Sequence, residues 1–166
     1  CLALLPLFNE LPLAHIILHP RLGKQQYKGE VDLEGFEAFY KECTHPLFYN
    51  GDLHTANDIR SITTRFPRLA GIVIGRGLLA NPALALEYKQ GTPISSDEMA
   101  KKVGQLHTEV FGSYREQLQG GDTQLLTKMK NFWEYLMPDG DRKAKKAIHK
   151  SNKLETYQAA VRSLLG

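Results

Sequence analysis

The chain has 166 residues, 42% of them hydrophobic, and a formal net charge of +3, which is typical of one globular domain or two small ones. No apolar run approaches the roughly 18 residues of a membrane span, so no membrane association is predicted. The two cysteines, Cys1 and Cys43, give neither a disulfide framework nor the spacing of a metal site, which favours a reducing compartment, most simply the cytoplasm.

The first segment is apolar and is predicted to be the end of a helix over Leu2–Phe8. It lacks a basic leader and is interrupted by Pro6 and Pro12, so it is not interpreted as a signal peptide. Because the chain begins with Cys rather than Met, we expect upstream sequence to be missing.

Three short apolar runs follow, and each is predicted to be a buried strand, near residues 15–19, 46–50 and 70–75. A segment with helical spacing follows each run. Strands that alternate with helices are typical of a parallel sheet built from βα units. Three parallel strands cannot close a barrel, which needs eight. Residues 1–91 are therefore predicted to be the C-terminal portion of a (β/α)8 TIM barrel.

Capping residues mark where the helices of this half should begin. Asp32 is predicted to cap the first, and Thr55 with Asp58 resembles a capping box for the second. Asn81 and Pro82 are predicted to start the third, over Ala83–Lys89.

Residues 92–166 contain no further strand pattern and are predicted to form a small antiparallel four-helix bundle. Ser95 should cap the first helix, Asp122 the second and Asn152 the last, and the short basic helix Arg142–Lys150 lies between. The fold class is thus α/β followed by all-α. The apolar stripes of the first two helices are Met99, Val103, Leu106, Val110, Tyr114 and Leu118, and then Leu125, Met129, Phe132, Trp133 and Leu136.

Small polar clusters follow the second and third strands, namely Asn50-Gly51-Asp52 and Gly75-Arg76-Gly77. Ligands of parallel α/β folds lie at the carboxyl ends of the strands, and phosphate is commonly held after the last two strands of a barrel. Arg76 could grip a phosphate bidentately, whereas Asp52 is expected to orient its turn. The alternative is that both clusters are ordinary βα turns.

The first strand ends at His19-Pro20-Arg21, beside these clusters. His19 could bond a phosphate or a cofactor ring, and Arg21 could meet an anion. In the loop that follows, Lys24 and Tyr27 could steer and stack on a nucleotide, or simply pack. No catalytic residue set and no metal site is predicted.

The last 28 residues hold seven Lys or Arg against three Asp or Glu, whereas residues 1–91 are neutral overall. This basic region could contact a polyanion or could be a solvated helix face.

Several motifs in their order resemble the tRNA-dihydrouridine synthase family. They are His19-Pro20-Arg21, Gln25-x-Tyr27-x-Gly29, Tyr49-Asn50-Gly51-Asp52, Ile74-Gly75-Arg76-Gly77 and Asn81-Pro82. The resemblance implies a flavin enzyme that uses NADPH to reduce uridine in tRNA, with FMN in a (β/α)8 barrel. It also implies that residues 1–91 are part of that barrel and that 92–166 form a helical tRNA-binding domain.

By the same resemblance, His19 would contact FMN, Asn50 and Gly51 would lie along its ribityl-phosphate, and Gly75 and Arg76 would bind the phosphate. Asp52 belongs to the same turn, and Arg21 would face either flavin or uracil. On charge and position rather than on a motif, the RNA contacts would come from Lys24, Tyr27, Arg142, Lys143, Lys146 and Lys150.

The family's catalytic cysteine and its flavin-contacting lysine have no counterpart in the chain, and Cys1 and Cys43 do not replace them. The fragment alone is therefore predicted to bind FMN poorly and to be inactive, and its open sheet edges could lead it to self-associate. Two alternatives remain: another FMN or phosphosugar barrel, and a non-catalytic RNA-binding module.

Overall fold

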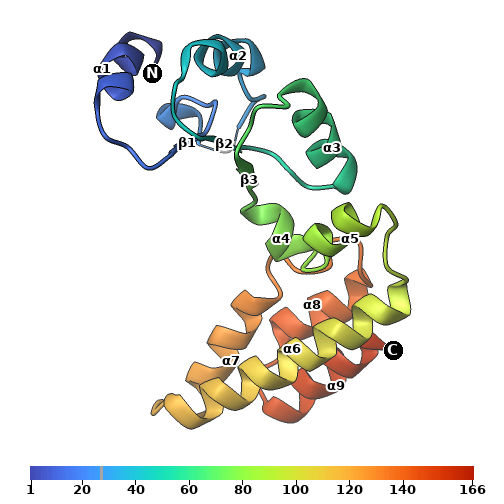
Figure 1. Cartoon of the computed structure of the whole chain (residues 1–166). Coiled ribbons are helices and arrows are strands. Elements are labelled where there is room, and N and C mark those ends of the chain that lie inside the picture. Colours follow the sequence, from blue (N-terminus) through green and yellow to red (C-terminus); the bar gives the residue numbers. More distant parts are fainter. Residues whose placement is uncertain (27) are drawn as a thin grey trace. The chain divides into compact units, whose positions relative to one another are not determined.

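The computed structural model describes residues 1–26 and 28–166. Two compact units are present: Cys1–Leu78 with Leu84–Gly91, called the strand unit here, and Leu79–Ala83 with Thr92–Gly166, called the helical unit (Figure 1). Tyr27, predicted to contact RNA, lies outside the described residues. Within the described part, no helix is both long and apolar enough to cross a membrane.

The strand unit contains a three-stranded parallel sheet in the order β1 (Ile16–Leu18), β2 (Leu47–Asn50) and β3 (Gly71–Val73). Ile17 lies opposite Phe48, and Tyr49 lies opposite Ile72. The prediction of three parallel strands joined by helices is confirmed. All three carboxyl ends lie at one edge of the sheet, because the strands are parallel.

The helices of the strand unit begin at the capping residues that the sequence predicts. Asp32 Oδ1 accepts a hydrogen bond from Gly35 N at 2.8 Å, and Thr55 and Asp58 form a reciprocal capping box. The elements are η1 (Leu2–Leu4), α1 (Leu5–Glu10), η2 (Gly23–Gln25), α2 (Leu33–Glu42), α3 (Ala56–Arg65), α4 (Arg76–Ala80) and α5 (Leu84–Gln90), of which α4 continues into the helical unit.

Two details of this half differ from the prediction. Arg76 is not in a turn, because it opens the short helix α4. Pro82 is not the first residue of a helix, because α5 begins at Leu84 after a turn in which Asn81 Oδ1 accepts from Ala83 N at 2.9 Å.

The core of the strand unit is aromatic and lies where α2 and α3 cover the sheet. Phe36 packs edge to face on Tyr49 and Phe66, with ring centroids 4.9 Å and 5.0 Å apart. All three are almost completely buried. Such pairs stabilise by both area and geometry, so the carboxyl end of β2 is firmly placed.

The helical unit is built from α6 (Ser96–Gln117), α7 (Gly121–Phe132), α8 (Arg142–Lys150) and α9 (Leu154–Leu165) (Figure 1). Their apolar faces share one core around Trp133, Met129 and Ile148, each fully buried. Ser95 caps α6 as predicted, accepting from Glu98 N at 3.2 Å. The description of these helices as an antiparallel bundle stays a prediction.

Three positions of the helical unit were predicted wrongly. Asp122 does not cap α7, which begins at Gly121, while Gln124 Oε1 accepts from Gly120 N at 2.9 Å. Asn152 does not cap α9, because Lys153 holds that position. Leu106 is 38% exposed, and its neighbour His107 takes the buried place instead.

Candidate functional site

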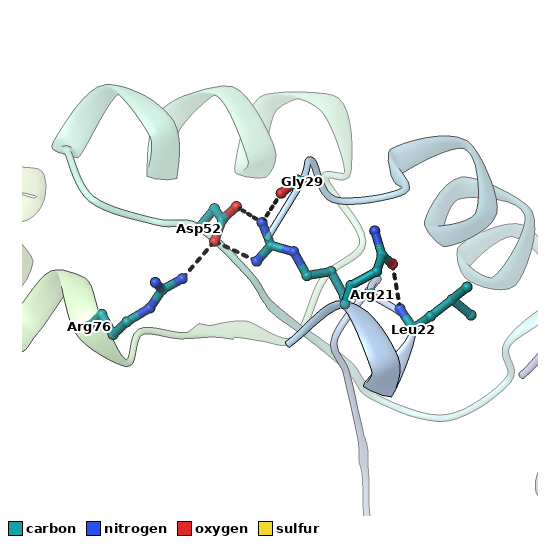
Figure 2. Close-up of polar contacts among 6 residues, drawn as sticks. Arg21, Leu22, Gly29, Asp52 and Arg76 are labelled. Atoms are coloured by element: carbon teal, nitrogen blue, oxygen red, sulfur yellow. Dashed lines mark hydrogen bonds and ion pairs between the residues drawn. The ribbon is translucent and has the colours of Figure 1, made fainter. Parts of the chain in front are cut away.

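Side chains from the carboxyl ends of all three strands meet around Asp52, which follows β2 (Figure 2). Arg21, which follows β1, donates to Asp52 through two nitrogens, Nη1 to Oδ1 at 2.8 Å and Nη2 to Oδ2 at 2.5 Å. Arg76, which follows β3, donates from Nη2 to Oδ1 at 3.1 Å. We call these three residues the strand-end cluster.

Arg21 is the most firmly held member of the cluster. Its side chain is only 4% exposed, and Nη2 also donates to the carbonyl of Gly29. Its Nε is buried and has no hydrogen-bond partner among the described residues. The side chains of Asp52 and Arg76 are 30% and 33% exposed. The cluster is therefore anchored at β1 and partly open at β2 and β3.

The electrostatics of the cluster favour the ionised forms of Asp52 and Arg21. The hydrogen bond from Arg21 is the main cause that holds the pKa of Asp52 below its usual range, and the same bond raises the pKa of Arg21. Two guanidinium groups share one carboxylate, so the cluster carries one excess positive charge. A site of this kind attracts an anion.

His19 lies at the same edge of the sheet, and the charges of the cluster affect its pKa. Partial burial is the main cause that lowers its pKa, Arg21 and Arg76 lower it further, and Asp52 acts in the opposite direction. The imidazole is therefore neutral near pH 7, with one nitrogen that can accept a hydrogen bond and one that can donate.

A glycine lets the first turn of α4, which follows β3, approach the segment after β2 closely. A Cβ on Gly77 would lie 1.9 Å from the carbonyl oxygen of Leu53, so only glycine fits there. A Cβ on Gly75, by contrast, would meet no described atom within 4 Å. The backbone at Gly75 thus faces open space, although packing does not require a glycine there.

A cavity of about 430 Å³ lies beside the carboxyl end of β1. Its walls come from the N-terminal turn, β1 and α2, and they include Leu2, Leu18, Phe36 and Asp32. His19 and Arg21 also line it, so these two residues border both the cavity and the strand-end cluster.

The predicted site residues differ in where the structure places them. The structure brings Arg21, Asp52 and Arg76 into direct contact, with His19 electrostatically coupled to them. Asn50 ends β2 half-buried, and Gly51 is buried. Lys24 is exposed in η2. The remaining predicted RNA contacts are exposed on α8 in the helical unit: Arg142, Lys143, Lys146 and Lys150.

Sequence reasoning missed that the cluster is internally bonded, since it treated Arg21 as a free anion ligand. The available signal was the order of charges, Arg, Asp and Arg, at three successive strand ends. The sequence also gave no sign that Lys145 differs from the other lysines of α8. Its Nζ donates to the carbonyls of Leu136 and Met137 at 2.9 Å and 3.2 Å. Over residues 1–26 and 28–166, no group of three or more His, Cys, Asp or Glu is placed to hold a metal ion.

Ligands of parallel α/β sheets bind at the carboxyl ends of the strands, and the strand-end cluster places a net positive charge there. The family model of dihydrouridine synthase (Dus) matches residues 13–164, so this chain belongs to the dihydrouridine synthase family. The resemblance found in the motifs is confirmed.

One curated relative is the "Probable tRNA-dihydrouridine synthase" of Rhizobium leguminosarum bv. phaseoli. It is 34% identical over 67 residues, which are 40% of this chain and 21% of the relative. The chain thus spans about a fifth of the length of that relative.

Proposed function

We propose that this chain is the C-terminal part of a flavin-dependent tRNA-dihydrouridine synthase, a cytoplasmic enzyme that reduces uridine in tRNA with NADPH and FMN. Residues 1–91 would complete an FMN-binding (β/α)8 barrel, and residues 92–166 would form a four-helix tRNA-binding domain. The single observation that carries the proposal is the strand-end cluster, which joins three neighbouring strand ends of a family member in one site of net positive charge.

The residues at the strand ends fit the phosphate of FMN. Arg76 offers a guanidinium, and the backbone of Gly75 faces open space that a phosphate could enter. Asn50 and Gly51 would follow the ribityl chain, and neutral His19 would hydrogen-bond the cofactor. When bound, FMN supplies the hydride that passes from NADPH to the uracil ring.

In this proposal, the residues of this chain bind and orient the cofactor. The side chain that gives a proton to the uracil ring belongs to another part of the enzyme. Cys43 follows α2, ahead of β2, and its Sγ contacts the carbonyl of His45 at 3.6 Å. Cys43 is therefore at the wrong end of its strand, and Cys1 is exposed at the start of the chain. The isolated fragment would bind FMN weakly and would not reduce uridine.

The tRNA contacts would come from α8 and from Lys24. Arg142, Lys146 and Lys150 are spaced by four residues and are exposed, so they lie on one side of the helix. Lys143 lies beside them and is exposed as well. A row of cations without an intervening acid suits a phosphate backbone.

The proposal is tested in the complete protein that contains this chain. We expect bound FMN, NADPH oxidation that tRNA accelerates, and dihydrouridine in the product tRNA. Arg76→Ala should weaken FMN binding roughly ten- to a hundredfold, the usual worth of a charged hydrogen bond. Arg60→Ala, an exposed arginine on α3, is the matched control and should leave FMN binding unchanged. A rate of NADPH oxidation that does not change when tRNA is added would instead indicate another FMN-binding barrel enzyme.

The basic surface of α8 favours a second candidate, a non-catalytic RNA-binding module. That module would bind tRNA with strong salt dependence and without flavin. Replacing Lys143, Lys146 and Lys150 by Gln should weaken tRNA binding under either proposal, so flavin content separates the two.

The isolated chain is also proposed to self-associate through its open sheet edge. β1 is at the edge of the sheet, and Ile17 on it is 50% exposed. Light scattering that shows only monomer at high concentration would contradict this.

A further inference from the structure

Asp52 is an unexpected residue for a phosphate site, because a carboxylate repels a phosphate. Both of its oxygens, however, are directed at guanidinium groups (Figure 2). Oδ2 accepts from Arg21, and Oδ1 accepts from Arg21 and from Arg76. The charge of the carboxylate is therefore balanced by a guanidinium group within the protein, and one positive charge remains to attract a ligand.

The two arginines play unequal parts around this carboxylate. Arg21 is buried, binds both oxygens at 2.5 Å and 2.8 Å, and contacts the Gly29 carbonyl. Arg76 is one-third exposed, and its contact with Oδ1 is longer, at 3.1 Å. Arg21 thus fixes the carboxylate, and the fixed carboxylate orients Arg76.

Charge balance gives Asp52 a second effect. The two guanidinium groups contact the same oxygen, Oδ1, so without the carboxylate they would face each other as like charges. Arg76 is the more exposed of the two, so it is the one expected to be displaced. Asp52 therefore holds Arg76 both by attracting it and by offsetting the repulsion from Arg21.

The backbone at this position also suits an acidic turn residue. Asp52 has φ of 41°, in the left-handed region that Asp and Asn tolerate better than most residues. Asp52→Asn should keep this backbone and the shape of the side chain while it removes the charge.

We propose that Asp52 is a positioning residue that presents Arg76 to the phosphate of the flavin nucleotide and does not itself touch the cofactor. This inference rests on the proposed function. It assigns Asp52 a role different from that of the other strand-end residues, since its effect on the ligand passes through Arg76.

The test compares FMN with riboflavin, which has the same ring and ribityl chain but no phosphate. In the complete protein, Asp52→Asn should weaken FMN binding at least about tenfold, and it should change riboflavin binding less than about twofold. In an Arg76→Ala background, Asp52→Asn should have little further effect on FMN binding. Asp97→Asn, on the exposed first turn of α6, removes the same charge elsewhere and should change neither affinity.

Three outcomes would overturn the proposal. Equal weakening of FMN and riboflavin would mean that Asp52 only supports the fold. Tighter FMN binding by Asp52→Asn would mean that the carboxylate merely repels the phosphate. Full additivity with Arg76→Ala would mean that Asp52 acts independently of Arg76. If the unmodified protein binds no FMN, the proposed function itself fails, and this inference fails with it.

A second variant keeps the test decisive if Asp52→Asn does not fold. Asp52→Glu keeps the charge but moves it outward by one methylene group. It should weaken FMN binding and spare riboflavin, because the carboxylate can no longer meet both arginines in the same geometry. FMN binding unchanged in this variant would also count against a positioning role.

Discussion

The strand unit and the helical unit each contain a cluster of three polar side chains, and the two clusters are built on opposite principles. At the strand ends, the side chain of Arg21 is buried, those of Asp52 and Arg76 are partly exposed, and the three carry a net positive charge. In the helical core, the cluster consists of His107, Tyr157 and Trp133, all neutral and all buried.

The neutral cluster is closed. Tyr157 Oη accepts from Trp133 Nε1 at 2.9 Å and lies 2.8 Å from His107 Nε2. Because Oη already accepts from Trp133, the Tyr157 hydroxyl can donate its own proton to Nε2 of neutral His107. Burial raises the pKa of Tyr157 to about 12 and lowers the pKa of His107, so both groups stay uncharged at neutral pH. The cluster therefore presents no net charge that would attract a ligand.

The cluster in the helical core is suited to specify the structure, whereas the strand-end cluster is suited to bind a ligand. A buried hydrogen-bonded network of this kind helps to specify a unique core, and its disruption is costly. A partly exposed cluster with one unbalanced positive charge contributes less to the stability of the fold, and its excess charge can still attract an anion. Changes in the helical cluster should therefore alter folding, and changes at the strand ends should alter binding.

The largest effect is expected for Trp133→Ala. Trp133 is fully buried and packs against Phe132 at 5.1 Å between ring centroids. Its loss should reduce the free energy of unfolding by ~3–5 kcal/mol, as for other large core truncations. Denaturant titration followed by circular dichroism measures it. The control Tyr135→Ala, at a side chain 47% exposed, should stay within ~0.5 kcal/mol of the wild type. Equal effects in the two variants would contradict this packing.

The next effect tests the strand unit without touching an ionised side chain. Gly77→Ala would place a Cβ 1.9 Å from the Leu53 carbonyl oxygen and push α4 away from the segment after β2. A loss of ~1–3 kcal/mol or more in the free energy of unfolding is expected. Gly75→Ala, two residues earlier, meets open space and is the matched control for calorimetry. If both variants melt together, the close approach at Gly77 is not a constraint on stability.

A smaller effect is expected for Tyr157→Phe, which deletes one oxygen from the closed cluster. His107 Nε2 and Trp133 Nε1 would lose their shared partner while they remain buried. A cost of ~1–3 kcal/mol follows from leaving buried polar groups unsatisfied. The same change at exposed Tyr135 should be near neutral in the same urea titration. An unchanged unfolding midpoint for Tyr157→Phe would show that the hydroxyl is dispensable.

Local signals in the sequence predicted much of the fold. The caps at Asp32, Thr55 and Ser95 are confirmed because each needs only neighbouring residues. The caps at Asp122 and Asn152 are wrong because other residues decide those helix starts. Gln124 supplies the acceptor before α7, and α8 ends at Lys150, which leaves three residues before α9, the last of them its N-cap Lys153.

Long-range contacts explain what the sequence did not predict. The motif order selected Arg21, Asp52 and Arg76, yet their mutual bonds depend on the order of strands, which no local pattern contains. The choice of Leu106 over His107 for the buried stripe was a one-residue ambiguity of helical periodicity. It is resolved by the hydroxyl of Tyr157, fifty residues further along.

The smallest effect is a pH dependence that distinguishes the two clusters. The lowered pKa of His107 means that the unfolded chain binds a proton more readily than the folded one as pH falls below about 6.5. The helical unit should therefore lose stability on acidification, by at most ~1.4 kcal/mol per pH unit. Trp133, the single tryptophan, reports this unit in urea titrations between pH 5 and pH 7. His107→Gln should flatten the slope, whereas His19→Gln, at the strand ends, should leave the Trp133-detected slope in place. Stability that rises on acidification would contradict a neutral His107 in the core.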